Sequence, residues 1–569
     1  TLKRKKMAGG GLGGSYSHKI ACIYIFNLIV GVGSLLLPLA FAQSGIILGS
    51  FMLALCCTCS FITVTYVIEA MSYSNALLKV KRLEEKYPHY LPKALNNDDT
   101  TMTQHIGLDF QTYGSINDAA TQEQEPTKVI EEEESDDGYL DDQKDPLTDS
   151  EVDHQHKFVA LLRKVFAKKK AVDPLSVLDV DSDEEENGIE YHRIKYQSEM
   201  GLLAEQFLGP IGKFFFYVVI SAYLFGDLAI YAVSVPLSLK NVTGAIPNLT
   251  EMQTYQIYVG IFAVLVVPIC FLNFSKTKYL QIATLFLRNV SLGMMIVISI
   301  IYIAEGHGTS FDSLTLFNFS GMKNLYGVVI YSFMCHHSLP GIVTPIRRKN
   351  WLNVLFSLDF VCILMTYVLL CVVAMFAFGD PHLQAHCQSK IGAGEPCFIQ
   401  ELYTTNFISY DVVPIGVFLN LFPVFTLTTN YPLIAITLRN NLVTLFSPIP
   451  LVKKYPRLTS FCMSAIASIP PIIVAVITTH VTDLAGYTGG FAGMFIEFVF
   501  PALIVYFARK ELKEHRYLKF VNLSYHESYF GHKAIIAVIL LLSLIGLGYN
   551  CVNVMLTLTN FIIRKIQHK

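Results

Sequence analysis

The sequence predicts an all-α integral membrane protein with about eleven transmembrane helices. Apolar runs of about 20 residues, the length of helix that crosses a hydrocarbon core of about 30 Å, recur along the chain. Of the 569 residues, 52% are hydrophobic and 15% are charged, whereas an ordinary soluble protein carries about 25% charged residues. Lys and Arg are concentrated in every second short loop, which is the pattern of a multi-pass protein.

The expected spans follow directly from the apolar runs. They are Lys19–Gln43, Gly45–Met71, Pro210–Leu239, Tyr255–Phe274, Tyr279–Ala304, Asn324–Pro345, Trp351–Phe378, Val412–Leu438, Leu458–Thr478, Leu484–Ala508 and Lys533–Leu558. The chain is thereby divided into an N-terminal cytoplasmic tail (1–18), helices 1 and 2 (19–71), a polar loop (72–208), helices 3 to 11 (209–558) and a C-terminal tail (559–569).

The charge of the short loops predicts the orientation in the bilayer. One alternate set of loops holds fourteen Lys and Arg residues and the other set holds three. Because positively charged loops stay in the cytoplasm, the N-terminus is expected inside and, with an odd number of spans, the C-terminus outside. Arg564, Lys565 and Lys569 in the C-terminal tail depart from this rule. The formal net charge of −2 does not favour nucleic acid as a partner.

The expected outer loops carry two features of an oxidising, glycosylating compartment. Asn241, Asn248 and Asn318 begin Asn-x-Ser/Thr sequons, where glycosylation is expected. Cys387 and Cys397 share the largest outer loop, where a disulfide is chemically permitted. Both the plasma membrane and the lysosomal or endosomal membrane fit these features, and the sequence does not choose between them.

The polar loop at 72–208 is expected on the cytoplasmic side. It is rich in Asp, Glu, Gln and Asn, with acidic runs at 131–137 and 179–186. Such a composition buries too little apolar area to fold, so we expect the loop to be largely disordered. It leaves room for a cytoplasmic protein partner, although it contains no specific binding motif.

Two of the spans contain residues that interrupt a helix. The first holds two Gly, a Ser and a Pro between Gly31 and Pro38, and the sixth holds a polar run from Tyr331 to Gly341. Inside a membrane, such interruptions are tolerated where the freed backbone groups line a cavity or meet a neighbour. Matching breaks in two five-span halves indicate an inverted-repeat transporter whose site lies near the midplane.

Each break offers the groups that bind a small zwitterion. Half-helix N-termini present N–H groups and a positive dipole end to a carboxylate, and unwound carbonyl groups can hold a cation. The expected substrate-binding residues are Asn27, Gly31, Val32, Gly33, Ser34, Phe333, Cys335, His336 and Ser338. Close helix packing is the alternative role of Gly31 and Gly33. His336 and His337 would point about 100° apart on a regular helix, so no metal site is expected.

Four segments of the chain resemble a known family. Asn27–Ala42 resembles the first helix of the amino acid/auxin permease family, in the amino acid-polyamine-organocation superfamily. Phe333–His336 with Pro340 resembles its sixth helix, and Tyr66–Met71 and Tyr223–Ala232 are similar to its transmembrane protein 104 subfamily. The resemblance covers all eleven spans but not the polar loop. It implies a leucine-transporter-type fold, with five-plus-five inverted repeats, broken helices 1 and 6 and one extra helix. It also implies amino acid transport driven by a sodium or proton gradient.

The resemblance further implies candidate ligands for a coupling ion. In sodium-coupled members an Asn of the first helix and a Thr of the eighth helix supply oxygen ligands, which Asn27 and Thr428 would provide here. Ordinary hydrogen bonding between helices is the alternative role of both residues. Some sodium-independent relatives in the wider superfamily place a Lys of the fifth helix where sodium would lie, and Arg288 of the fifth span would fill that role here.

Three ionisable residues inside the spans bear on coupling. Arg288 lies deep in the fifth span, Asp227 in the third and Glu497 in the tenth. Intramembrane charges are costly and normally face a partner or a cavity. We expect Asp227 or Glu497 to change protonation during transport, with Arg288 as a counter-charge; a static ion pair with Arg288 is the alternative.

The leading function is secondary active transport of amino acids or similar small solutes by alternating access, with Na⁺ or H⁺ as the coupling ion. A membrane sensor that binds amino acids and signals through the polar loop, without significant flux, is the alternative. No paired Asp, His-Glu-x-x-His or Gly-x-Ser-x-Gly arrangement lies in a span, so an enzyme is not expected, and no other cofactor is implied. Substrate identity and oligomeric state are left open by the sequence.

Overall fold

The computed structural model describes residues 16–86, 194–272, 278–347, 349–379, 398–514 and 526–567. Regular structure in these ranges is helical, apart from an isolated bridge between Tyr16 and Ile346. Contacts divide the chain into two units. The first contains Thr1–Ser74, Ile194–Glu511 and Ser524–Lys569, and the second contains Asn75–Arg193 and Leu512–Leu523. All residues discussed below as a site belong to the first unit.

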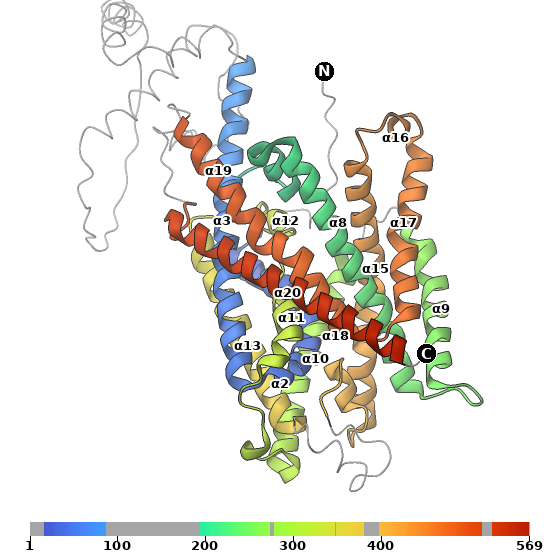
Figure 1. Ribbon diagram of the computed structural model, residues 1–569. Coiled ribbons are helices and arrows are strands. Elements are labelled where there is room, and N and C mark those ends of the chain that lie inside the picture. Colours follow the sequence, from blue (N-terminus) through green and yellow to red (C-terminus); the bar gives the residue numbers. More distant parts are fainter. Residues whose placement is uncertain are drawn as a thin grey trace, which may run out of the picture. The chain divides into compact units, whose positions relative to one another are not determined.

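The helices of the described ranges are drawn in Figure 1. They are α1 (His18–Ile29), α2 (Gly33–Ser44), α3 (Ile46–Lys86), α8 (Met200–Thr243), α9 (Glu251–Cys270), α10 (Lys278–Tyr302), α11 (Met322–Phe333), α12 (Leu339–Val343), α13 (Leu352–Phe378), α15 (Val413–Leu445), α16 (Pro450–Lys454), α17 (Pro456–Ile477), α18 (Val481–Tyr487), α19 (Phe500–Glu514) and α20 (Lys533–Gln567). In this part of the chain nine helical segments are long and apolar enough to cross a membrane, or ten if the bent pair of α1 and α2 forms one span. The all-α, multi-pass membrane fold is therefore confirmed.

The expected sixth span, Asn324–Pro345, corresponds to α11 and α12. Because α12 has only five residues, this pair is not among the candidate spans, and the expected number of eleven is reached only if it crosses the membrane as a broken helix. Cys387 and Cys397 lie outside the described residues.

Helices extend into both ends of the expected polar loop. Helix α3 continues past Met71 to Lys86, through a stretch of Ala, Leu, Lys, Arg and Glu that favours helix. Helix α8 begins at Met200 and is interrupted at Gly209, where φ is 73°. A proline disfavours helix at the residue before it, so Pro210 marks the start of the third span as expected. Residues 87–193 of the loop are outside the described part.

The helices of the first unit pack in two groups (Figure 1). Helices α8, α9, α15 and α17 pack against one another. In the second group α11 contacts α2 and α18, while α13 contacts α1, α2 and α10. Contacts of α18 with α8, and of α10 with α15, join the groups. Helix α13 therefore lies beside the broken helices, and α8, α10 and α15 supply the remaining walls of the site.

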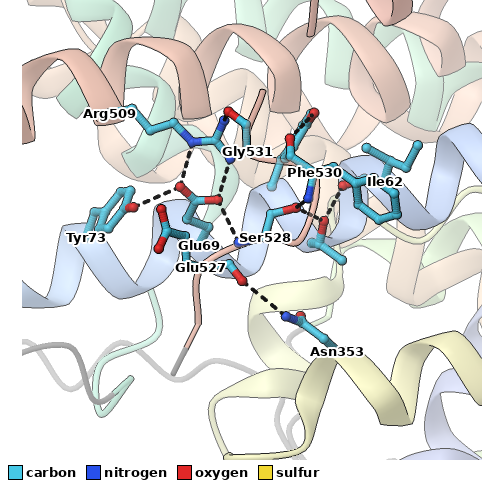
Figure 2. A network of polar contacts seen from close by, with 11 residues as sticks. Ile62, Glu69, Tyr73, Asn353, Arg509, Glu527, Ser528, Phe530 and Gly531 are labelled. Atoms are coloured by element: carbon cyan, nitrogen blue, oxygen red, sulfur yellow. Dashed lines mark hydrogen bonds and ion pairs between the residues drawn. The ribbon is translucent and has the colours of Figure 1, made fainter. Parts of the chain in front are cut away.

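A buried ion pair ties α3 to α19 (Figure 2). Glu69 is fully buried, and its two carboxylate oxygens accept hydrogen bonds from Nε and Nη2 of Arg509 at 2.7 Å each. The same carboxylate accepts from the Tyr73 hydroxyl at 2.8 Å and from the backbone N–H of Ser528 at 3.1 Å. Arg509 Nη1 donates to the Gly531 carbonyl at 2.9 Å. We call these five residues the Glu69 network; it leaves neither carboxylate oxygen without a donor.

The three sequons differ in how accessible their side chains are. The amide nitrogen of Asn241 donates to Thr405 Oγ1 at 3.2 Å, and that of Asn318 donates to the Gln43 carbonyl at 2.9 Å. Asn248 is exposed on the turn before α9. Of the three, Asn248 presents the most accessible nitrogen to a glycosylating enzyme.

Candidate functional site

Both helix breaks expected from the sequence are present. Helix α1 ends at Ile29 and α2 begins at Gly33, with a bend of 55° between them. Helix α11 ends at Phe333, and Met334 beyond it is extended, with ψ of 113°. The α-helical hydrogen bonds are therefore interrupted twice, and the freed backbone groups need other partners.

The two glycines of the first break have different surroundings. A Cβ placed on Gly33 would lie 2.7 Å from the Cα of Ser332, so α2 and α11 can meet there only without a side chain. A Cβ placed on Gly31 would have its nearest neighbour at 3.9 Å, an ordinary contact. Close packing therefore explains Gly33, whereas Gly31 faces open space.

One cavity of about 680 Å³ reaches both breaks. Its wall from the first break includes Asn27, Gly31, Val32 and Gly33, and its wall from the second includes Met334, His337 and Ser338. Helices α8, α10 and α15 complete it with Tyr223, Asp227, Tyr231, Thr284, Arg288, Asn430, Thr437 and Asn441. The two interruptions that the sequence singled out thus border one space.

The cavity extends toward the side that loop charge predicts to be cytoplasmic. Its lining includes Tyr16 before α1, Glu199 before α8 and Asn441 near the end of α15. The N–H of Tyr16 donates to the Pro345 carbonyl at 3.1 Å, and its hydroxyl donates to the Ile342 carbonyl at 2.5 Å. Burial raises the pKa of Tyr16 to about 12, so this hydroxyl stays a neutral donor at physiological pH.

Arg288 satisfies the carbonyl groups left free where α1 ends. Its Nη1 donates to the carbonyl oxygens of Asn27 at 2.6 Å and Val30 at 2.9 Å. Among the described residues Arg288 forms no ion pair, neither with Asp227 nor with Glu497. The negative end of the α1 dipole takes the place of the carboxylate expected as its partner.

Tyr367 of α13 reaches both breaks at once. Its hydroxyl lies 3.2 Å from the Ile29 carbonyl and 3.1 Å from the Ser332 carbonyl. A hydroxyl has one proton, so it donates to one carbonyl at a time. This role is not predictable from sequence, because a tyrosine in an apolar helix indicates only that its hydroxyl needs some partner.

The N–H side of the first break is open. The backbone N–H groups of Gly31 and Val32 bond to no acceptor in the described part of the chain, whereas those of Ser34 and Leu35 donate to the carbonyls of Gly31 and Val32. Gly31 and Val32 both line the cavity. Free N–H groups at the positive end of α2 are suited to an anionic ligand.

Asp227 forms an anionic position in the cavity wall. The Tyr331 hydroxyl donates to its carboxylate, and no cationic side chain pairs with it in the ranges described. Aromatic rings surround it: the ring of Tyr223 lies 6.2 Å from that of Tyr331 and 5.6 Å from that of His337. His337 Nδ1 is buried without a hydrogen-bond partner in the structure.

Comparisons with known proteins agree with this arrangement. A profile of the family described as transmembrane amino acid transporter protein matches residues 14–96 and 183–389. The transmembrane protein 104 homolog of Dictyostelium discoideum is 38% identical over 545 residues, which cover 95% of this chain and 98% of that protein. The chain belongs to this family of amino acid/auxin permeases.

Mammalian relatives in the same family carry the name transmembrane protein 104. That of Homo sapiens is 34% identical over 523 residues, covering 87% of this chain and 88% of the relative. That of Mus musculus is 33% identical over 552 residues, covering 92% of this chain and 94% of the relative. The resemblance noted in the sequence is confirmed, and the family is one of transporters rather than enzymes.

In this family member several expected substrate residues lie outside the cavity wall. Ser34 Oγ donates to the Gly31 carbonyl at 2.7 Å and so supports the break itself. Phe333 stacks on Phe360, at 6.3 Å between ring centroids. Cys335 is fully buried, and Nε2 of the buried His336 lies 2.9 Å from the Thr63 hydroxyl. The adjacent His337, which is not among the expected substrate residues, lines the cavity instead.

Two of the expected coupling residues also lie away from the cavity. Thr428 of α15 is not part of its wall, to which that helix contributes Asn430, Thr437 and Asn441 among others. Glu497 is completely buried within the second of two consecutive π-helical segments, Thr488–Gly493 and Phe495–Val499. Neither of its carboxylate oxygens has a hydrogen-bond partner among the described residues. Asn27 does line the cavity, and its Oδ1 accepts from Asn289 at 2.9 Å.

Proposed function

We propose that the protein is a secondary carrier that moves amino acids or similar small zwitterions by alternating access. One observation supports this function above the others, namely that a single cavity borders both helix breaks. The free N–H groups of Gly31 and Val32 offer a position for the substrate carboxylate. The cavity has the size of a small-molecule site.

The packing of the helices supports an inverted repeat of five plus five spans. The first, third and fourth expected spans correspond to α1 with α2, to α8 and to α9. Helix α2 packs on α11, α8 packs on α15 and α9 packs on α17. Each of these spans therefore contacts the span five places later in the chain, which is the neighbour expected about a two-fold axis in the membrane plane.

The opposite side of the breaks is closed by close helix contacts. A Cβ placed on Gly327 of α11 would lie 2.7 Å from the Cα of Gly486 in α18, and one on Gly489 would lie 2.8 Å from the backbone nitrogen of Tyr331. A cavity open toward one side and sealed on the other is one half of an alternating-access cycle. The conformation supports an inward-facing state.

Arg288 supports coupling that does not use sodium at the first break. A sodium ion there would need the unwound carbonyl oxygens, and Arg288 already donates to two of them. Its charge is permanent, since the guanidinium does not deprotonate in proteins. We therefore favour a proton as the coupling ion, carried by one of the two intramembrane acids, Asp227 or Glu497.

Uptake by purified protein in liposomes tests this function. Labelled amino acids are supplied singly, with sodium and proton gradients imposed independently. We expect saturable uptake of at least one amino acid that responds to the proton gradient and is unchanged when choline replaces sodium. Uptake that requires sodium would contradict the coupling proposal, and saturable binding without flux would favour the sensor.

A further inference from the structure

We infer that the substrate carries a second, cationic group that binds at Asp227, so that amino acids with a positively charged side chain are the preferred class. This inference rests on the proposed carrier function and adds a substrate class to it.

The charge of the cavity wall leads to this class. Its acidic lining residues are Asp227 and Glu199, and its only guanidinium or ammonium group among the described residues is that of Arg288. Because Arg288 is engaged with the carbonyl oxygens of the first break, it does not neutralise Asp227. A solute that brings its own positive charge restores the balance.

Several of the unwound carbonyl groups already lie against a hydrogen-bond donor. Arg288 donates to Asn27 and Val30, and Tyr367 lies within hydrogen-bonding distance of the carbonyls of Ile29 and Ser332. Of the two acidic residues in the wall, Asp227 is the one bonded to α11 next to the second break, whereas Glu199 precedes α8 near the opening. A cationic group that reaches the breaks therefore meets Asp227.

The surroundings of Asp227 also favour a cation. Tyr331 donates its hydroxyl proton to the carboxylate and so orients it. The rings of Tyr223, Tyr331 and His337 lie side by side, and aromatic faces attract ammonium and guanidinium groups. A carboxylate with adjacent tyrosines recognises both the charge and the apolar stem of a basic side chain.

The two binding positions are connected through neighbouring residues of α11. Gly33, next to the free N–H groups of the first break, packs on Ser332 of α11. The neighbouring residue Tyr331 extends from the same turn to Asp227. Gly31, Val32 and Asp227 line the same cavity, so a substrate that binds at both positions needs a positive charge on its side chain in addition to its carboxylate.

The test compares the uptake of lysine and arginine with that of glutamine and methionine, neutral amino acids of similar length. In the unaltered protein the basic amino acids are expected to have the lower KM. Asp227→Asn should raise the KM for lysine by about 10- to 100-fold, the effect of losing a hydrogen-bonded charge partner, and change the KM for glutamine far less. Asp411→Asn, an exposed acid before α15, is the matched control and should change neither.

The outcomes separate the inference from the proposed function. Uptake of neutral amino acids alone, or a lysine KM that Asp227→Asn leaves unchanged, would overturn the inference while the carrier stands. Absence of uptake of any amino acid would overturn both. If Asp227→Asn does not fold, Asp227→Glu keeps the charge but moves it, and an unchanged ratio of lysine to glutamine KM in that variant would also overturn the inference.

Discussion

The Glu69 network and the Asp227 position are two intramembrane carboxylates with opposite surroundings. Glu69 is fully buried and accepts four hydrogen bonds, two of them from Arg509. Asp227 accepts from one hydroxyl and borders an open cavity. Because a buried charge is stable only when it is fully compensated, the first carboxylate is part of the scaffold. The second has capacity left for a ligand.

Glu497 differs from both. It is as buried as Glu69, yet neither of its oxygens has a partner in the structure, and it does not line the cavity. An uncompensated charge at such a buried position is costly. Glu497 is therefore suited to holding a proton rather than a solute.

The largest effect is expected from removing one partner of the Glu69 network. Arg509→Ala leaves the carboxylate of Glu69 buried without its cation, a change that costs about 3–5 kcal/mol. This loss of stability is measured by heating the protein in detergent and recording the fraction that stays monodisperse. Arg457→Ala, which removes an exposed arginine from the first turn of α17, is the control. Equal stability of the two variants would show that the network does not hold α3 and α19 together.

An intermediate effect is expected at the first break. Gly33→Ala places a methyl group against Ser332 and should destabilise the protein by about 1–3 kcal/mol. Gly31→Ala meets no atom closer than 3.9 Å and should change stability by less than about 0.5 kcal/mol. The pair is compared by the same unfolding measurement. If Gly31→Ala lowered the stability more than Gly33→Ala, the assignment of Gly33 to close packing would be wrong.

The smallest effect is expected at an exposed ion pair, where solvent screens the charges. His480 Nδ1 lies 2.9 Å from Glu401 Oε1, and the His480 side chain is 68% exposed. The hydrogen bond to Glu401 raises the pKa of His480. The contribution of this ion pair to folding stability is therefore fully present below the pKa of histidine in the unfolded chain, about 6.5, and is lost as the pH rises through the pKa of His480 in the folded protein.

Comparing unfolding temperatures at about pH 5.5 and about pH 8.5 measures this contribution. His480→Asn should lower the unfolding temperature slightly at the acidic pH and leave it unchanged at the alkaline one. His307→Asn, at an exposed histidine without an ion pair in the described residues, should show no such difference. If His480→Asn lowered the unfolding temperature only at the alkaline pH, the assigned direction of the His480 pKa shift would be wrong.

The sequence located the features that disrupt a helix or oppose burial. Gly33 and Pro340 marked the two breaks because neither fits a regular helix interior. Asp227 and Arg288 stood out because charge is costly in a bilayer. These signals are local, and they identified the elements that border the cavity.

The partners of these residues depended on contacts between distant segments. Arg288 meets the end of α1 rather than a carboxylate, because the free carbonyl groups there carry partial negative charge. Backbone charge of this kind is not apparent from residue types. Tyr331 and His337 belong to the second broken helix and meet residues of α8, while Tyr367 of α13 meets the end of α1. His337 rather than His336 lines the cavity for a similar reason, since the backbone beyond Phe333 is extended and does not follow helical periodicity.

Solute counterflow most directly tests the central claim, that the cavity at the two breaks is the site of a carrier. Liposomes containing the protein are loaded with unlabelled amino acid, and a trace of labelled amino acid is added outside without any ion gradient. A carrier predicts a transient accumulation of label above the equilibrium level, abolished when Gly31→Trp fills the cavity of a protein that still folds. Saturable binding with no accumulation, or accumulation unaffected by Gly31→Trp, would contradict the account.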